Sequence, residues 1–444
     1  MFDFGGKKYT VVTYGCQMNL HESEKIAGIL ENMGFIKADD IENSDIVVFN
    51  TCCIRDTAER RALGNIGKLK QLKRRNKNML LVVVGCMTQQ KGFAENFKAR
   101  YDYVDIVLGT HNISELEDKI IERISKRKRI AAVYDCDGYI DDETTPLSRT
   151  SYPNAWVNIN YGCNNFCTYC IVPYVRGRER SRDTDSIVAE CERLVKEGYG
   201  EITLLGQNVN SYGSDLPDGS NFAALLQRVA DIDGKFRIRF MTSHPKDLTR
   251  EVVETIKNND KICNNIHLPV QAGSNDVLKN MNRRYTREHY LGLLEMIREI
   301  LGGGVGITSD IMVGFPMETE KDFEDTLDLT EKARFSTAFT FIYSVRKGTK
   351  AAEMPQLPYE VKQDRIKRLI ELQNNITAEL SENYIGNVYE VLIEGLAEKK
   401  KGYVCGRTES GRLVNVGGGA ELIGKFKNVL IREARHAALY GDII

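Results

Sequence analysis

The first third of the chain alternates short apolar runs with longer segments whose apolar positions recur at helical spacing. The apolar runs predict strands at residues 9–14, 46–50, 80–84 and 104–108, and the longer segments predict helices at 22–33 and 57–75. Strands that are apolar on both faces are typical of a parallel sheet covered by helices on both sides. The pattern therefore predicts a parallel α/β sheet domain over residues 7–124, with an edge strand at 130–134.

The middle of the chain repeats this alternation, and the end changes to a different one. Strands are predicted at 156–161, 201–205, 236–241, 266–270, 305–312 and 338–343, followed by an amphipathic helix at 359–384. Such β/α units predict a TIM-type (β/α) barrel over 149–380, so the fold class is α/β. Short strands at 388–394, 402–406, 413–416 and 425–434, separated by glycine-containing turns, predict a small antiparallel OB-like barrel over 383–444.

Composition limits the function classes that need to be considered. The 444 residues carry 61 basic and 62 acidic side chains, so nucleic-acid binding has to come from local patches. No apolar run approaches the roughly 18 residues of a membrane span, and we expect no membrane partner and a cytoplasmic location. Eleven cysteines, an odd number, fit a reducing compartment and metal ligation better than a disulfide framework.

Cys163, Cys167 and Cys170 form a C-x3-C-x2-C pattern directly after the first predicted barrel strand. Three thiolates on a four-iron cluster leave one iron open to another ligand, so this loop is the candidate catalytic centre. The alternative is a zinc knuckle, which usually needs a second pair of cysteines or histidines. No such pair follows at finger spacing. The pattern therefore favours a cluster with an open iron.

Cys16, Cys52 and Cys86 each stand just past the end of a predicted strand, at nearly equal intervals. In a parallel sheet with right-handed crossovers these ends lie at one edge, where open α/β sheets bind ligands. Each cysteine alone would be interpreted as a small buried hydrophobe. Their repetition at one structural position predicts a second cluster, and Cys53 is expected to point elsewhere.

The segments at residues 14–19, 50–55, 85–89 and 162–170 resemble the cysteine motifs of the radical S-adenosylmethionine (SAM) methylthiotransferases. The resemblance implies two 4Fe-4S clusters and SAM as cofactors, with Tyr169 packing near the adenine of SAM. Gln207 and Asn208 stand where the radical SAM superfamily often has a Gly-Gly-Glu motif, as they do in this family. We expect SAM or substrate contacts from the strand-end residues Gln207, Asn208, Gln271, Ser309 and Asp310.

Two groups of basic residues are candidate RNA contacts. The last domain resembles the TRAM module of RNA-modifying enzymes, in which Tyr403 offers a stacking surface. Arg176 and Arg178 lie just beyond the cysteine loop, where a solvated charge run is the alternative interpretation. The residues predicted to contact phosphate are Arg176, Arg178, Lys399, Lys400, Arg407 and Arg412.

The resemblance also implies a reaction. One SAM donates a methyl group and another is the radical source for methylthiolation of carbon 2 of N6-isopentenyladenosine beside the tRNA anticodon; Arg55 of the second motif favours this branch of the family. The expected partners are the tRNA anticodon stem-loop and a flavodoxin or ferredoxin as electron donor; the sulfur donor is unassigned and the chain is expected to be a monomer. Alternatives are methylthiotransferases for threonylcarbamoyladenosine or for a ribosomal-protein aspartate, and a non-catalytic metal-containing RNA-binding protein.

Overall fold

The structure is a computed structural model that describes residues 4–53, 56–134 and 145–444, so Arg55 lies outside the described residues. The chain divides into two compact units. The first contains residues 1–150, 161–164 and 170–180, and the second contains 151–160, 165–169 and 181–444. The cysteine loop contributes Cys163 and Cys170 to the first unit and Cys167 to the second.

The first unit contains a six-stranded sheet in which all pairs are parallel, in the order β2-β1-β3-β4-β5-β6. The predicted parallel sheet and its edge strand are confirmed. Its strands are β1 (Lys8–Thr13), β2 (Ile36–Lys37), β3 (Ile46–Thr51), β4 (Leu80–Gly85), β5 (Ile106–Leu108) and β6 (Ile130–Ala132).

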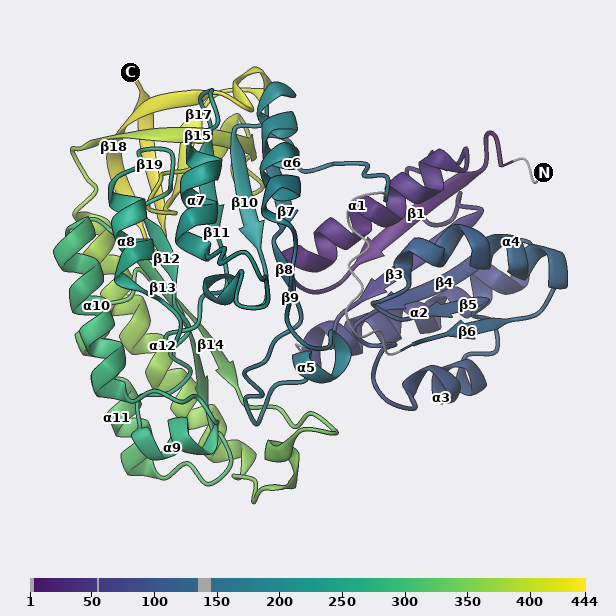
Figure 1. The fold of residues 1–444 in the computed structure, drawn as a ribbon, viewed down its shortest axis with the longest axis horizontal. Coiled ribbons are helices and arrows are strands. Elements are labelled where there is room, and N and C mark those ends of the chain that lie inside the picture. The colour runs from purple at the N-terminus through teal and green to yellow at the C-terminus, as the bar shows by residue number, and fades with distance from the viewer. Residues whose placement is uncertain (1–3, 54–55, 135–144) are drawn as a thin grey trace. The chain divides into compact units, whose positions relative to one another are not determined.

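Helices cover both faces of this sheet (Figure 1). Side chains alternate between the faces of a strand, so Val48 of β3 packs with α1 (Gln17–Asn32) and α4 (Leu116–Lys126). Val47 packs on the opposite face with α2 (Asp56–Arg75) and α3 (Phe93–Arg100). Since both faces are buried, the strands can be apolar throughout, which explains the pattern seen in the sequence.

The second unit contains six further parallel strands in two sheets, β11-β10-β7 and β12-β13-β14. A single bridge between Ile238 and Ile262 connects the sheets, so the predicted TIM-type barrel is realised as two arcs of three strands. The strands are β7 (Asn154–Asn158), β10 (Glu201–Leu205), β11 (Arg237–Phe240), β12 (Asn265–His267), β13 (Gly306–Val313) and β14 (Thr337–Ile342).

Helices lie along the outer side of these strands and share one apolar core with them (Figure 1). Leu204 of β10, Phe240 of β11 and Ile311 of β13 point into this core. The helices are α6 (Thr184–Lys196), α7 (Phe222–Ala230), α8 (Arg250–Lys257), α10 (Arg287–Leu301), α11 (Glu320–Ala333) and α12 (Tyr359–Glu382). Because neighbouring residues alternate between faces, Thr203 of β10 and Asp310 of β13 lie on the opposite face of their strands.

The end of the chain forms a closed five-stranded barrel in the order β15-β16-β17-β19-β18. All pairs are antiparallel except β17 with β19. The strands are β15 (Val388–Leu396), β16 (Tyr403–Arg407), β17 (Leu413–Gly417), β18 (Phe426–Arg435) and β19 (Ala438–Ile443). The sequence prediction missed β19, because only Leu439 of this short strand is a fully buried apolar residue.

The turn between β16 and β17 lies against the amino ends of the parallel strands. Arg239 of β11 donates to the Thr408 carbonyl oxygen at 3.3 Å, and Asn265 of β12 donates to that of Ser410 at 3.3 Å. A Cβ atom at Gly306, which begins β13, would overlap the Ser410 carbonyl oxygen. The C-terminal barrel thus covers the amino ends and leaves the carboxyl ends of these strands for chemistry.

Candidate functional site

The carboxyl ends of β1, β3 and β4 lie side by side, because β3 pairs in parallel with both neighbours. Thr51, the last residue of β3, lies opposite Gly85, the last residue of β4. Cys16, Cys52 and Cys86 follow the three strand ends within one to three residues. The three cysteines therefore leave the sheet at the same edge.

Glycines allow the backbones that carry these cysteines to approach each other. Gly15 has a φ of 122°, and a Cβ atom there would lie 2.5 Å from the Cys52 Cβ and 2.9 Å from its Sγ. Gly85 has a φ of 104°, and a Cβ atom would overlap the Thr51 backbone. Both glycines directly precede a cysteine, so the repeated Gly-Cys pair in the sequence was a usable signal of close packing.

Cys53 was expected to point away from this edge, and the structure contradicts that expectation. Its buried thiol forms a side-chain hydrogen bond with Cys86. This bond, together with nearby Arg176, lowers the pKa of the Cys86 thiol although burial opposes the shift. The same bond is the largest cause of the raised pKa of Cys53, as expected if Cys53 is the donor.

A buried cation also faces the cysteines of the first unit. Arg176 is 3% exposed and donates to Glu22 Oε1 at 2.7 Å and to Asn19 Oδ1 at 3.2 Å. Its charge opposes the rise in the pKa of Cys16 that burial causes. Arg176 thus places positive charge beside Cys16 and Cys86, where deprotonated thiols would need it.

The cysteines of this edge can be compared with the demands of a metal centre. Within residues 4–53, 56–134 and 145–444, no three Cys, His, Asp or Glu side chains are gathered closely enough to share one metal ion. In a four-iron cluster each thiolate binds its own iron, so the sulfurs lie farther apart than around one ion. Three thiols at one edge with a buried guanidinium beside them fit such a cluster.

The loop with the C-x3-C-x2-C pattern is held by hydrogen bonds in each unit. In the first unit the Cys163 amide donates to the Gly177 carbonyl oxygen at 3.2 Å, and Gly162 has a φ of 72°. In the second unit Cys167 is 8% exposed, and Arg283 Nη1 donates to its Sγ at 3.4 Å. The sequence contained no sign that Arg283 lies beside this cysteine.

Tyr169 packs against an apolar cluster at the carboxyl ends of the barrel strands, as part of the second unit. The cluster contains Ala272, Met281, Phe315 and Tyr343. This location is compatible with the expected packing beside an adenine ring.

Unpaired polar atoms gather at the carboxyl ends of β10 and β11. Asn208 Nδ2 donates to Asp247 Oδ2 at 2.7 Å, while Asn208 Oδ1 is buried and has no hydrogen-bond partner among the described residues. The side-chain amide of Asn210, Ser243 Oγ and His244 Nε2 are also buried and without a hydrogen-bond partner among the described residues. Buried polar atoms usually have partners, so these atoms are suited to a polar ligand such as the amino-acid part of SAM.

His244 is a neutral member of this group. Burial, followed by the charges of Arg283 and Lys246, lowers the pKa of His244 to about 2. Its Nδ1 accepts a hydrogen bond from the Lys246 amide at 3.2 Å, which leaves Nε2 as the donor. Gln207 is half-buried beside Asn208. Asn210 and Ser243 were not predicted as site residues, although both follow the ends of predicted strands.

The other predicted cofactor residues lie at the ends of β12 and β13. Gln271 has a φ of 74°, and its backbone amide donates to the Asp310 carbonyl oxygen at 2.9 Å. Asp310 Oδ1 lies 3.7 Å from His267 Nε2. Ser309 Oγ donates to the Leu268 carbonyl oxygen and accepts from the Val270 amide, both at 3.0 Å. The cofactor contact predicted for Ser309 is therefore contradicted, because its buried hydroxyl joins β13 to the segment that follows β12.

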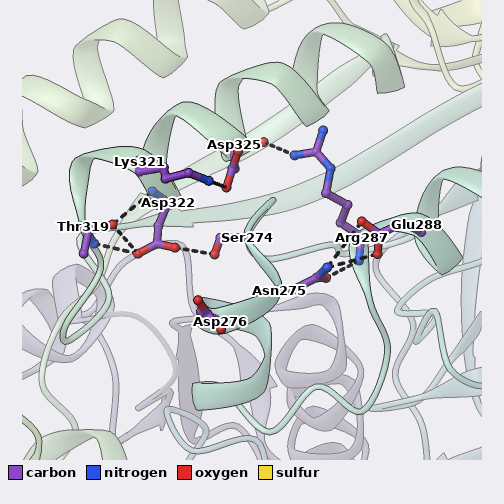
Figure 2. A pocket seen from close by; sticks show the side chains of 9 residues that line it. All are labelled: Ser274, Asn275, Asp276, Arg287, Glu288, Thr319, Lys321, Asp322 and Asp325. Carbon is purple, nitrogen blue, oxygen red and sulfur yellow. Dashed lines mark hydrogen bonds and ion pairs between the residues drawn. The ribbon is translucent and has the colours of Figure 1, made fainter.

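A pocket elsewhere in the second unit shows different chemistry (Figure 2). Ser274 and Thr319, which cap the starts of α9 (Asn275–Asn280) and α11, both bond Asp322. Arg287 pairs with Asp328 beside it. These groups already satisfy one another, so the pocket is explained by helix capping. Its lining residues are Ser274, Asn275, Asp276, Arg287, Glu288, Thr319, Lys321, Asp322 and Asp325.

Comparisons with known proteins agree with this layout. The Radical SAM superfamily model matches residues 157–330, the TRAM domain model matches 382–444, and the uncharacterized protein family UPF0004 matches 8–109. A tRNA-2-methylthio-N(6)-dimethylallyladenosine synthase of Carboxydothermus hydrogenoformans is 51% identical over 99% of each chain. A protein of the same name from Thermoanaerobacter pseudethanolicus is 49% identical over 98% of this chain and 92% of its own. This chain belongs to the tRNA-2-methylthio-N(6)-dimethylallyladenosine synthase family.

Solved structures with a similar fold have much lower sequence identity to this synthase family member. The radical SAM methyltransferase TsrM from Kitasatospora setae matches with a TM-score of 0.58 and 14% identity, over 87% of this chain and 78% of its own. The cobalamin-dependent SAM radical enzyme OxsB matches with a TM-score of 0.55 and 14% identity, over 84% and 58%. At this identity the likeness concerns the fold alone. No helix in the described part of the chain could cross a membrane.

The TRAM barrel of this synthase family member carries a surface of tyrosines and cations. Lys400 Nζ lies 3.5 Å from the ring centre of Tyr403 and 5.1 Å from that of Tyr440. Arg435 lies 5.2 Å from the Tyr440 ring centre. Tyr440 was missed because β19 was not predicted, and Arg435 was missed because it stands just past the predicted strand at 425–434, at the end of β18. We call Lys400, Tyr403, Arg435 and Tyr440 the tyrosine-cation surface.

The structure contradicts the RNA contacts predicted for Arg176 and Arg412. Arg176 forms the buried pair with Glu22 described above, and Arg412 is 4% exposed and donates to the Ser336 carbonyl oxygen and Ser381 Oγ, both at 3.0 Å. Their guanidinium groups hold protein atoms together. Arg178, Lys399 and Lys400 are exposed, and Arg407, also exposed, pairs with Glu394.

Proposed function

We propose that this chain methylthiolates carbon 2 of N6-isopentenyladenosine, also called dimethylallyladenosine, next to the anticodon of tRNA. One observation carries the proposal. Relatives named for this product are 49–51% identical over 98–99% of the chain. The proposed domains are 7–124 for one cluster, 149–380 for SAM and the other cluster, and 383–444 for RNA.

The proposal assigns two 4Fe-4S clusters to the two sets of cysteines. When bound, the cluster at Cys163, Cys167 and Cys170 supplies an electron for SAM cleavage, and the cluster at the sheet edge carries the sulfur to be inserted. The edge is supported by the three neighbouring strand ends and by the positive charge of Arg176. The carbon to be modified has no acidic proton, which explains why the proposal needs radical rather than acid-base chemistry.

The second unit supplies the groups that would hold SAM. The unpaired atoms of Asn208, Asn210, Ser243 and His244 offer acceptors and donors for its polar end. Because His244 is neutral, it donates a hydrogen bond without adding a charge that would repel the sulfonium. Tyr169 would pack beside the adenine. The remaining predicted contacts, Gln207, Gln271 and Asp310, stay proposals.

For RNA, we propose that bases of the anticodon stem-loop stack on the tyrosine-cation surface while Lys399 contacts phosphate. Aromatic faces accept any base, and lysines track the backbone, so this surface would add affinity rather than sequence choice. Arg178 and Arg407 remain further candidate contacts. A flavodoxin or ferredoxin is the proposed electron donor, and the chain is proposed to act as a monomer.

Mass spectrometry of nucleosides from bulk tRNA tests this proposal. Cells that lack the gene should lose methylthio-isopentenyladenosine and accumulate isopentenyladenosine, and a plasmid copy should reverse both changes. A plasmid copy with the loop cysteines changed to alanine is the matched control, and it should reverse neither change. Unchanged isopentenyladenosine derivatives would reject this substrate and direct the test to threonylcarbamoyladenosine and then to ribosomal-protein aspartate. Zinc without acid-labile sulfide in the purified protein would instead support a non-catalytic RNA-binding protein.

A further inference from the structure

The segment after α9 holds the cysteine loop within the second unit. The Thr168 amide donates to the Met281 carbonyl oxygen at 3.1 Å, and Thr168 Oγ1 donates to that of Asn280 at 2.8 Å. Asn282 Nδ2 donates in the opposite direction, to the Phe166 carbonyl oxygen at 3.0 Å. Residues 280–282 therefore bind the backbone on both sides of Cys167.

Arg283 follows directly and is turned inward by its neighbours. Asn282 and Arg284 have φ values of 58° and 56°, a left-handed conformation that few residues other than glycine adopt. The Arg283 amide donates to the Leu278 carbonyl oxygen at 2.9 Å, and its side chain is 5% exposed. Two left-handed residues around one buried arginine indicate that this local backbone is built to place the guanidinium.

The guanidinium makes three directed contacts. Nε donates to the Tyr285 hydroxyl at 2.9 Å, and Nη2 donates to the Pro269 carbonyl oxygen at 2.8 Å. Nη1 donates to Cys167 Sγ at 3.4 Å. The first two contacts fix the plane of the group, so that the third points at the sulfur.

The positive charge of Arg283 has no carboxylate partner among the described residues. The buried arginines Arg239 and Arg365 each have a carboxylate partner, at 3.0 and 2.8 Å, whereas buried Arg412 bonds carbonyl and hydroxyl oxygens. In the described part of the chain no carboxylate lies within ion-pair distance of Arg283. Its guanidinium has three acceptors, which are the Tyr285 hydroxyl, the Pro269 carbonyl oxygen and Cys167 Sγ. A buried charge without a counter-charge is strongly unfavourable. Of these three acceptors, only the Cys167 sulfur becomes anionic when it ligates iron.

We propose that Arg283 is the charge partner of Cys167 as a cluster ligand, and that it raises the reduction potential of the cluster at the C-x3-C-x2-C loop. This inference rests on the proposed function, since it requires a cluster on that loop. Hydrogen bonds to the sulfurs and net charge set the potentials of such clusters. A fixed cation beside one ligand stabilises the reduced, more negative cluster. Arg283 is thus a positioning residue that helps the cluster to accept the electron it passes on.

The test compares Arg283→Gln with wild type as the full chain, loaded with iron and sulfide under argon. Redox titration followed by electron paramagnetic resonance reads the potential of each cluster. The cluster at the sheet edge is an internal control, and Arg298→Gln is the matched variant, because partly buried Arg298 donates to the Ala333 carbonyl oxygen. We expect a more negative potential for the loop cluster in Arg283→Gln, and unchanged values for the edge cluster and for Arg298→Gln.

An Arg283→Gln protein that binds about eight irons with both potentials unchanged would overturn the inference. If this variant instead retains only about four irons, Arg283→Lys decides. Restored iron with an intermediate potential supports the role of charge, and failure to restore iron refutes it. A wild-type protein with two clusters that does not modify tRNA would reject the proposed function and leave this inference intact.

Discussion

Replacing Arg239 by methionine should destabilise the second unit strongly. Arg239 donates to both carboxylate oxygens of Glu201, each at 3.0 Å, and also to the Thr408 carbonyl oxygen. The side chains of the pair are only 8% and 5% exposed. Methionine fills similar space but leaves the Glu201 carboxylate buried without its cation, and the turn at Thr408 without a donor.

The size of the effect follows from this burial. Removing one partner of a buried ion pair costs about 3–5 kcal/mol, because the remaining charge is still desolvated. In a unit of this size that loss lowers the melting temperature by on the order of 10 °C. The exposed pair of Arg432 and Asp442 has a similar separation of 2.9 Å, but its side chains are 62% and 65% exposed. Arg432→Met is therefore the matched control and should cost no more than about 1 kcal/mol.

Thermal unfolding of iron-loaded protein under argon measures both variants. Limited proteolysis adds a local readout, since Arg239→Met should release the C-terminal barrel at lower protease concentration than Arg432→Met. The double variant Arg239→Met, Glu201→Leu should recover most of the stability, because it removes both charges from the interior. If Arg239→Met melts like Arg432→Met, or if the double variant is no more stable than Arg239→Met, the reasoning from buried charge is wrong.

Further predictions concern the sites. Changing all three cysteines of the C-x3-C-x2-C loop to alanine should abolish SAM cleavage and leave about four irons per chain, and loss of all iron would contradict two separate sites. Gly15→Ala should reduce edge-cluster iron severalfold, because the new Cβ would lie 2.9 Å from Cys52 Sγ at a φ of 122°; Gly6→Ala, also at positive φ but with open space around it, is the control for iron content. Tyr403→Ala should weaken tRNA binding by about 1–3 kcal/mol, measured by filter binding, whereas unchanged affinity would exclude stacking at this position.

The architecture of the chain could be predicted because its signals are local. A strand buried on both faces is a continuous apolar run, and β4, with the sequence Leu-Leu-Val-Val-Val-Gly, shows this whatever it packs against. The repeated cysteine after a strand could be placed at one sheet edge because parallel topology brings the carboxyl ends of strands together. The short β19 was missed, since its one fully buried apolar residue gives no pattern to detect.

Single residues of the sites could not be assigned in this way. Arg176 and Arg412 are basic residues that the sequence could not distinguish from the exposed Lys399. Tertiary contacts turn their guanidinium groups inward, towards Glu22 and Ser336. The contact between Cys53 and Cys86 joins two strand ends that are far apart along the chain. Charge and hydrogen-bonding capacity belong to the residue type, whereas the partner that uses them depends on what folds beside it.

The sequence by itself determined the kind of chemistry available to this protein, through six cysteines at two sets of spacings and the periodicity of its strands and helices. Only the tertiary structure decided which charges serve that chemistry. Arg283 comes to Cys167 from 116 residues away, held by two left-handed residues and a carbonyl oxygen of another strand end. A period in the sequence reports which face of an element is buried, but the direction of a buried cation is set by long-range contacts that no local pattern encodes.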